Sequence, residues 1–319
     1  MPVRIAVAGA GAFGIKHLDA LARIEDAEVV AVVSRRLAQA EEVAARYGVP
    51  FATEELRDVL DSPDVEAVIL CTPTQLHARE TIDTLEAGKH VQVEIPLADS
   101  WHDARAVENV AKRSSLVAMV GHTRRFNPSH QWIHQRVKSG DLSVLQMDVQ
   151  TYFFRRTNTN ALGQPRSWTD NLLWHHAAHT VDLFAYQANE PVDVAHILAG
   201  PVNPELGIPM DVSIQLRTVS GRLCTLSLSF NNEGPFGTFF RYICDNGTYL
   251  ARYDDLTTGN DEPVDVSHVA VSLDGIELQD REFLRAIRDG DEPNASVASV
   301  LDCYAVLGKL QRDLDDSFL

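Results

Sequence analysis

Residues 3–14 read Val3-Arg4-Ile5-Ala6-Val7-Ala8-Gly9-Ala10-Gly11-Ala12-Phe13-Gly14, and this stretch decides the fold. An apolar, β-branched run ends at a glycine and a helical pattern follows, which predicts a strand, a tight turn and a helix. The glycines have the G-x-G-x-x-G spacing of a dinucleotide-binding turn, in which Gly9 permits the turn, Gly11 admits a pyrophosphate and Gly14 lets helix and strand pack closely. The helix start offers N–H groups and a positive dipole to phosphates. We therefore expect a cofactor at Gly9, Gly11, Ala12, Phe13 and Gly14; the alternative is a purely structural glycine turn.

The composition narrows the class of protein. The chain has 319 residues, enough for two domains of roughly 150 residues each. Its net charge of −17 argues against a nucleic-acid partner or an anionic membrane surface. A charged-then-apolar leader and an apolar run of about 18 residues are both missing, so we expect a soluble, cytoplasmic protein. Four widely spaced cysteines without a C-x-x-C pair indicate buried, reduced thiols: Cys71, Cys224, Cys244 and Cys303.

Strand-like and helical patterns alternate through residues 1–121. Strands are predicted at residues 3–8, 28–33, 67–71, 90–93 and 116–120, and helices at 12–24, 38–47, 55–60, 76–86 and 99–112. Gly48 and Gly88 stand where helix C-caps belong. This alternation predicts an α/β Rossmann domain with a doubly wound parallel sheet over residues 1–122.

The pattern changes after Gly121. Helices are predicted at residues 128–138, 172–187, 276–288 and 295–314, strands at 145–154, 192–198, 210–218, 223–230, 238–244 and 248–253, and a loop at 155–170. The turns Ser220-Gly221 and Asn246-Gly247 separate neighbouring strands as hairpins. Residues 123–319 are therefore expected to form an α+β domain with a large, mostly antiparallel open sheet.

The type of dinucleotide depends on the end of the second strand. An NAD site places Asp or Glu there, about 20 residues past the glycines, to accept from the ribose 2′-hydroxyl. This chain has Ser34-Arg35-Arg36, and a hydroxyl with two guanidinium groups suits a 2′-phosphate, which indicates NADP, with NAD a weaker possibility. The alternative is an exposed arginine pair that opens a surface helix. Further cofactor-binding candidates follow the parallel strands at their carboxyl ends: Thr72, Pro73, Gln75, His77 and Glu94.

The richest chemistry lies in residues 168–182, which hold three histidines. His175 and His179 are four residues apart and share a helix face with Asp182. Imidazole is the usual general base near neutral pH, and Asp182 either fixes the tautomer or serves packing. The spacing of His175 and His179 also resembles the zinc-protease motif, but that motif needs Glu where His176 stands, so we expect no metal. The third hypothesis is that these polar side chains only pack at a domain interface.

Two arginine pairs adjoin aromatic residues in this acidic chain and indicate recognition of carboxylates. The substrate-binding candidates are Arg124, Arg125, Arg155, Arg156 and Trp168. Neighbours on a strand point to opposite faces, so at most one of Arg155 and Arg156 should face a pocket. A solvated pair or an internal salt bridge is the alternative.

These motifs together resemble the glucose–fructose oxidoreductase/inositol dehydrogenase family across both domains. The shared motifs are Gly9–Gly14, Thr72-Pro73, Glu94-Ile95-Pro96, Gly121-x-x-x-Arg125-Phe126 and His179-x-x-Asp182. The resemblance implies a nicotinamide-dependent oxidoreductase, a homodimer and a proton-transfer role for His179. Ile95 stands where the family has a lysine that reaches the substrate hydroxyl, and His175 and Ala177 stand where it has Asp and Gly. The lysine and aspartate roles therefore do not carry over, which disfavours a polyol substrate.

Longer blocks resemble one branch of that family, the 4-carboxy-2-hydroxymuconate-6-semialdehyde dehydrogenases of protocatechuate 4,5-cleavage. These blocks are residues 69–75, 89–98, 120–130, 150–156, 173–183 and 225–232. The resemblance implies a small dicarboxylate substrate that closes as a cyclic hemiacetal and is oxidised with NADP⁺ to the lactone 2-pyrone-4,6-dicarboxylate. His179 would act as base, His175 or His176 would orient the hydroxyl, and Glu94 would contact the nicotinamide end. A thioester route through Cys71, a sugar or cyclitol dehydrogenase and an NADP(H)-binding sensor are the alternatives.

Overall fold

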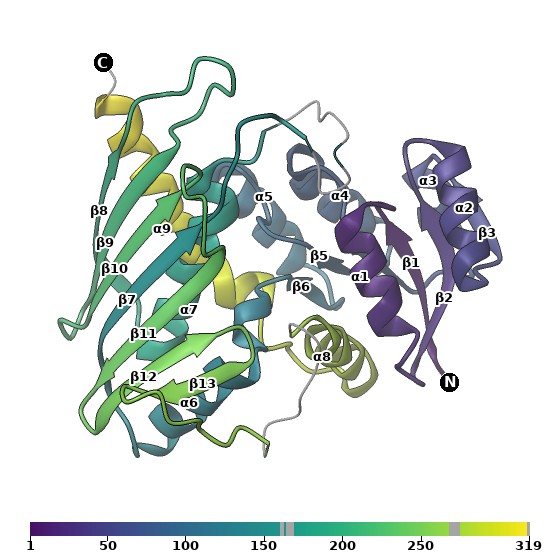
Figure 1. Ribbon diagram of the computed structural model, residues 1–319. Coiled ribbons are helices and arrows are strands. Elements are labelled where there is room, and N and C mark those ends of the chain that lie inside the picture. The colour runs from purple at the N-terminus through teal and green to yellow at the C-terminus, as the bar shows by residue number, and fades with distance from the viewer. Residues whose placement is uncertain (160–162, 164–168, 268–274, 318–319) are drawn as a thin grey trace. The chain divides into compact units, whose positions relative to one another are not determined.

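A computed structural model describes residues 1–159, 163, 169–267 and 275–317 (Figure 1). The chain divides into two compact units, each with its own sheet. Unit 1 comprises Met1–His122 with Ile276–Leu301, and unit 2 comprises Thr123–Gly275 with Asp302–Leu319. The first segment of unit 1 ends at His122, where the sequence predicts a domain boundary. Residues 276–301, which the sequence analysis places in the second domain, cluster with unit 1.

Unit 1 contains a six-stranded, fully parallel sheet in the order β3-β2-β1-β4-β5-β6. Its strands are β1 (Val3–Ala8), β2 (Ala27–Val33), β3 (Phe51–Thr53), β4 (Ala67–Leu70), β5 (His90–Val93) and β6 (Ala118–Val120). The order reverses between β1 and β4, and such a switch point is where ligands bind in doubly wound sheets. The predicted Rossmann topology is therefore confirmed, although the short edge strand β3 was not predicted.

Six helices connect and complete this sheet. They are α1 (Ala12–Leu21), α2 (Leu37–Tyr47), α3 (Leu56–Leu60), α4 (Thr74–Glu86), α5 (Trp101–Ala111) and α8 (Ile276–Asp289). Helix α8 packs beside α1, and α4 packs beside α5 (Figure 1). Helix α8 buries Phe283 and Leu284, and its Asp280 contacts the buried His17 of α1, so this late segment belongs to unit 1. Exposed ion pairs of Arg23 with Glu277 and of Arg288 with Asp26 lie at the rim of this contact.

Unit 2 contains a seven-stranded sheet in the order β13-β12-β11-β7-β10-β9-β8. Its strands are β7 (Val144–Tyr152), β8 (Val192–Ala199), β9 (Asp211–Thr218), β10 (Leu223–Ser229), β11 (Gly237–Cys244), β12 (Gly247–Arg252) and β13 (Asp255–Thr258). Only the pairing of β7 with β10 is parallel among the pairs in the described residues. The mostly antiparallel sheet is as predicted, apart from β13, which was not predicted.

One face of this sheet is covered and the other is open. Along β9 the side chains alternate strictly between exposed and buried, as expected for a strand with one solvated face. The remaining elements of unit 2 are the 3-10 turn η1 (Thr123–Arg125), α6 (Pro128–Ser139), the π-helical turn η2 (Leu172–Ala177), α7 (Ala178–Ala188) and α9 (Val297–Ser317), whose first residues belong to unit 1. Helix α7 packs on β7 and β9, and the Lys309 ammonium on α9 donates to the Ala195 carbonyl of β8 at 2.7 Å.

The predicted helix 172–187 is two elements, because η2 is wider than an α-helix and α7 begins at Ala178. The Asn171 side-chain oxygen accepts from the Trp174 backbone N–H at 2.7 Å and caps the π-helical turn. Such turns are rare and are frequently found at functional sites. Periodicity alone did not reveal this turn because its apolar pattern fits an ordinary helix equally well.

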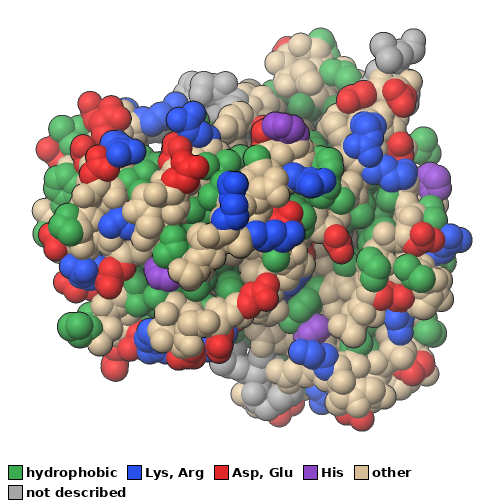
Figure 2. Space-filling model, turned by 180° about the vertical axis from the view of Figure 1, so that it is seen from behind, with side chains coloured by type: hydrophobic (Ala, Val, Ile, Leu, Met, Phe, Trp, Pro, Cys, Tyr) green, Lys and Arg blue, Asp and Glu red, His purple; other side chains and the backbone are tan. Residues whose placement is uncertain are grey.

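The surface carries both signs of charge. On the face in Figure 2, Lys and Arg side chains are interspersed with Asp and Glu side chains.

None of the helices in the described ranges has the length and apolar character needed to cross a bilayer. All four cysteines are free thiols, and Cys71 is half-buried whereas the other three are buried.

Candidate active site

The glycine turn of unit 1 is shaped by close backbone contacts. Gly9 has φ of +110°, and a Cβ atom there would lie 2.3 Å from the Cys71 carbonyl oxygen. A Cβ atom on Gly14 would lie 1.8 Å from the Gly9 carbonyl oxygen, so α1 can approach the turn only with glycine at this position. A Cβ atom on Gly11 would meet nothing within 4 Å. The space beside Gly11 and the open N-terminus of α1 therefore suit a pyrophosphate.

The end of β2 and the start of α2 meet the glycine turn through Gln39. The Ser34 hydroxyl and the Arg36 guanidinium both donate to Gln39 Oε1, at 3.3 and 3.0 Å. Gln39 Nε2 donates to the Ala10 carbonyl at 2.8 Å. Arg35 and Arg36 are exposed, as a pair that meets a phosphate from solvent must be. Gln39 was missed from the sequence because its role depends on contacts that no local pattern reports.

The carboxyl end of β4 is braced by two side chains of α4. The Thr72 hydroxyl donates to the Glu80 carboxylate, and burial raises the pKa of Glu80 to about 6 although that hydrogen bond opposes the shift. The two ring nitrogens of His77 lie 2.8 Å from the carbonyl oxygens of Thr72 and Pro96. His77 is buried and both of its ring nitrogens face these carbonyl oxygens, so the side chain holds the turn in place; a contact with the cofactor stays a prediction. Pro73 and Gln75 open α4, with the Gln75 side chain exposed.

Glu94, at the carboxyl end of β5, belongs to a buried polar cluster. Its Oε1 accepts from His17 Nε2 at 3.1 Å and from Gln279 Nε2 at 3.3 Å. Both carboxylate oxygens of Asp280 on α8 lie within 3.0 Å of His17 Nδ1. Burial lowers the pKa of His17, yet the charge and hydrogen bond of Asp280 outweigh it and raise that pKa well above its ordinary value. Gly121 completes the cluster, since a Cβ atom there would lie 2.6 Å from Glu94 Oε1.

These features of unit 1 fit a nicotinamide dinucleotide. The glycine turn would hold the pyrophosphate, the group around Gln39 would hold the adenosine ribose, and Glu94 lies at the end of a strand next to the switch point. When bound, the nicotinamide ring accepts or donates a hydride.

In unit 2, the π-helical turn carries two of the candidate histidines. The Asn171 backbone N–H donates to His175 Nδ1 at 3.1 Å, which makes the neutral ring a donor at Nε2. His176 packs its ring against Phe153 and Phe230, and its Nε2 lies 3.8 Å from Asp170 Oδ2. The two neighbours therefore have different surroundings, a distinction that the sequence did not provide.

His179 lies on the first turn of α7 and is half-buried, four residues after His175. Asp182, one turn further along, binds Arg125 through both carboxylate oxygens, at 2.8 Å to Nε and 2.6 Å to Nη2. Both partners of this pair are buried. Of the two roles considered for Asp182, the structure favours packing, because this carboxylate anchors Arg125.

Arg125 was expected to bind substrate, but its guanidinium forms that internal salt bridge and lies over the Tyr186 ring at 4.6 Å. Arg155 was a second such candidate, and both of its terminal nitrogens bind the Asp170 carboxylate. Burial raises the pKa of Asp170, but the neighbouring His176 ring and the hydrogen bonds and charge of Arg155 outweigh it and hold that pKa far below its ordinary range. The internal-salt-bridge alternative therefore applies to both arginines.

The other two arginines are oriented differently. Arg124 donates to Asn127 Oδ1 at 3.3 Å and its guanidinium lies 5.0 Å from the centre of the Tyr253 ring. Arg156 is exposed, stacks on Phe154 and donates to neutral oxygens, among them Asn231 Oδ1 at 3.0 Å. Trp168, the remaining substrate-binding candidate, lies outside the described residues.

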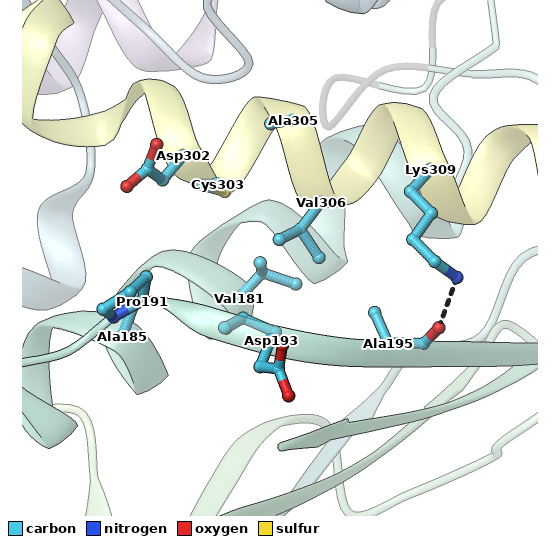
Figure 3. A pocket seen from close by; sticks show the side chains of 11 residues that line it. Val181, Ala185, Pro191, Asp193, Ala195, Asp302, Cys303, Ala305, Val306 and Lys309 are labelled. Carbon is cyan, nitrogen blue, oxygen red and sulfur yellow. Dashed lines mark hydrogen bonds between the residues drawn. The ribbon is translucent and has the colours of Figure 1, made fainter. Parts of the chain in front are cut away.

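A pocket of about 270 Å³ lies in unit 2 between α7, the start of β8 and α9 (Figure 3). Val181 and Val306 form part of its apolar wall, and Asp193, Asp302 and Lys309 bring charge to it. None of the predicted site residues that the structure describes lines it. Across the described ranges, no group of three or more His, Cys, Asp or Glu side chains is arranged to hold a metal ion.

Comparisons with known proteins agree with this architecture. Residues 3–122 match the model of the oxidoreductase family with an NAD-binding Rossmann fold, and residues 128–270 match the bacterial oxidoreductase C-terminal model. The 4-carboxy-2-hydroxymuconate-6-semialdehyde dehydrogenase of Sphingobium sp. (strain NBRC 103272 / SYK-6) is 66% identical over 313 residues, which cover 98% of this chain and 99% of that protein. The scyllo-inositol 2-dehydrogenase (NAD(+)) of Bacillus subtilis (strain 168) is 33% identical over 44% of this chain and 41% of its own length.

Solved structures of the same fold share far less sequence. A levoglucosan dehydrogenase in complex with NADH and levoglucosan has a TM-score of 0.87 at 18% identity, and covers 99% of this chain and 98% of its own. Taken together, the parallel sheet with its glycine turn, the antiparallel second sheet and a relative of nearly the same length show that the chain belongs to the glucose–fructose oxidoreductase/inositol dehydrogenase family of NAD(P)-dependent oxidoreductases.

Proposed function

We propose that this protein oxidises the cyclic hemiacetal of 4-carboxy-2-hydroxymuconate-6-semialdehyde to 2-pyrone-4,6-dicarboxylate, with NADP⁺ as hydride acceptor. The observation that carries the proposal is the 66% identity, over nearly the full length of both chains, to the Sphingobium dehydrogenase named for that semialdehyde. The histidines of η2 and α7 and the oriented arginines of unit 2 supply chemistry suited to such a substrate.

The chemistry is the oxidation of a secondary alcohol. The hemiacetal carbon loses a hydride, its hydroxyl loses a proton, and a lactone carbonyl forms between them. His179 is proposed as the base that accepts the proton, because its half-buried side chain lies on the first turn of α7 and imidazole is the usual general base near neutral pH. His175, a donor at Nε2, is proposed to orient the hydroxyl oxygen, and the ring of His176 is held by Asp170 and two phenylalanines.

The substrate carries two carboxylates. Arg124 and Arg156 are proposed to bind them, because both guanidinium groups are oriented on aromatic rings and hydrogen-bond to side-chain amide oxygens. Arg125 and Arg155 instead form internal salt bridges with Asp182 and Asp170. This division is specific enough for single variants to test, since only the first pair should affect substrate affinity without affecting stability.

A thioester route through Cys71 is disfavoured. Burial raises the pKa of the Cys71 thiol, although the nearby His17 opposes the shift, so little thiolate is present at neutral pH. Cys71→Ala is expected to keep its turnover. An inactive but folded Cys71→Ala protein would restore the thioester mechanism and contradict the hemiacetal proposal.

NADP is proposed in preference to NAD because Ser34 and Arg36 converge on one acceptor while Arg35 lies exposed beside them. Ser34→Asp combined with Arg35→Ala should shift the preference toward NAD, because a carboxylate repels the 2′-phosphate and accepts from a 2′-hydroxyl. Unchanged Michaelis constants for both nucleotides would contradict this assignment.

The test of the function is a direct assay. The purified protein is mixed with NADP⁺ and the semialdehyde, and absorbance at the nicotinamide band is followed while the pyrone dicarboxylate is quantified by chromatography. One reduced nucleotide per pyrone supports the proposal. Turnover of inositol or glucose with none of the semialdehyde would establish a polyol dehydrogenase, and binding of NADPH without turnover of any of these would establish a sensor.

The homodimer implied by the resemblance stays a proposal. The open face of the seven-stranded sheet in unit 2 is the candidate surface, with Thr225 and Ser227 of β10 on that face. Light scattering coupled to size exclusion gives the mass directly, and a value near one chain of 35.3 kDa would contradict it.

A further inference from the structure

Gln39 joins three parts of unit 1 through one side-chain amide. Its Oε1 accepts from Ser34, at the end of β2, and from Arg36, the N-cap of α2. Its Nε2 donates to the Ala10 carbonyl within the glycine turn. Gln39 and Ser34 are half-buried and Arg36 is exposed, so this group of side chains lies at the protein surface, where a ligand could reach it.

The amide oxygen is a neutral acceptor with two donors. A 2′-phosphate offers the same two donors a charged acceptor, and charge-assisted hydrogen bonds are roughly twice as strong as neutral ones. A phosphate can therefore draw both donors away from Gln39. A ribose 2′-hydroxyl, by contrast, can itself donate to the amide oxygen.

We propose that Gln39 is a specificity-determining residue that sets the ratio of NADP to NAD affinity. Its oxygen holds the Ser34 hydroxyl and the Arg36 guanidinium until a 2′-phosphate takes them, and it remains an acceptor for a 2′-hydroxyl. Its nitrogen fixes the position of this group relative to the glycine turn that holds the pyrophosphate. The inference rests on the proposed use of a nicotinamide dinucleotide.

Two replacements of similar size separate the functions of this amide. Gln39→Glu makes the acceptor anionic, so it retains both donors, accepts from a 2′-hydroxyl and repels a 2′-phosphate. Gln39→Met removes the acceptor and releases Ser34 and Arg36 for a phosphate. Both replacements lose the hydrogen bond to Ala10, and this shared effect cancels when the two nucleotides are compared as a ratio.

Ala38→Glu is the matched control. Ala38 is exposed, and its replacement adds the same charge one residue away without touching the Gln39 amide. Melting temperatures establish that each variant is folded. Dissociation constants for NADPH and NADH are measured by fluorescence titration of the full-length protein, and competition with adenosine 2′,5′-bisphosphate and with 5′-AMP isolates the adenosine end.

Gln39→Glu is expected to shift the NADPH-to-NADH affinity ratio toward NADH by at least about tenfold, because like charges are brought together. Gln39→Met is expected to shift it in the opposite direction, and Ala38→Glu by less than about threefold, since its charge is exposed to solvent and screened. If Gln39→Glu and Ala38→Glu shift the NADPH-to-NADH affinity ratio equally, the added negative charge alone explains the change, and the proposal is overturned. An unchanged ratio in both Gln39 variants would also overturn it.

The same titrations keep the two proposals apart. A parent protein that binds NADH as tightly as NADPH contradicts the proposed NADP preference. The change in the ratio from parent to variant still decides the role of Gln39.

Discussion

Arg125→Met is the replacement that best separates structure from substrate binding in unit 2. The Arg125 guanidinium binds Asp182 at 2.8 and 2.6 Å, with the two residues 5% and 2% exposed. Removing the arginine leaves the Asp182 carboxylate buried without its counter-ion. Breaking a buried pair in this way costs about 3–5 kcal/mol, which lowers the melting temperature by on the order of 10 °C.

The matched control is the double variant Arg125→Met with Asp182→Leu. Replacing both partners of a buried ion pair by apolar residues is often neutral or stabilising, so the double variant should regain most of the lost stability. Urea unfolding followed by circular dichroism gives the free energies of unfolding, and initial rates give the Michaelis constant for the semialdehyde. A single variant that is as stable as the parent but has a strongly raised Michaelis constant would refute this reasoning and return Arg125 to the substrate site.

Three further predictions concern the base, the glycine turn and pH. His179→Ala should lower kcat by ~10²–10⁴ with little change in NADPH affinity, and near-full activity would remove His179 from the role of base. Gly14→Ala should lower the melting temperature of the protein without cofactor, because its Cβ would meet the Gly9 carbonyl oxygen at 1.8 Å; Gly11→Ala, with nothing within 4 Å, should keep that temperature and weaken NADPH binding instead. Equal melting temperatures for these two variants would contradict the packing argument. Burial, with the charges of Lys138 and Arg125, lowers the pKa of His134 from 6.5 to about 4, so the unfolded chain binds a proton first as pH falls. The stabilisation that neutral His134 contributes should therefore be fully present above pH 6.5 and should fall by roughly 2–3 kcal/mol between pH 6.5 and 4. Urea titrations at pH 7 and pH 5 measure the free energy of unfolding, and the loss between these two pH values should be smaller in His134→Gln than in the parent. An identical loss in both proteins would show that another group causes it.

Local sequence patterns predicted the strands and helices of unit 1 well, because these elements form from residues that are close together in the sequence. The run from Val3 to Gly14 contains a buried strand, a glycine turn and a helix start, and each needs only neighbouring residues to form. The alternation of strands and helices then fixed the parallel sheet. The three-residue strand β3 was not predicted, since so short an edge strand has too few side chains to show a period.

The partners of charged side chains were not predictable in the same way. The arginine pairs were found from the sequence, but Arg125 pairs with Asp182 and Arg155 with Asp170 through folding of the chain. Nothing in the spacing of these residues distinguishes an internal salt bridge from a substrate contact. The same applies to His17, whose helical position predicts burial but not its place between Glu94 and Asp280.

Helix α8 has a consequence for how this protein is made. Asp280 reaches His17 and Gln279 reaches Glu94 from a segment that leaves the ribosome only after all seven strands of the second sheet. The nucleotide-binding half therefore cannot complete its interior until residues 276–301 have been translated, even though its glycine turn is made much earlier. Until then the apolar surface of this unit stays exposed, and partly folded chains of this kind tend to aggregate and to need chaperones.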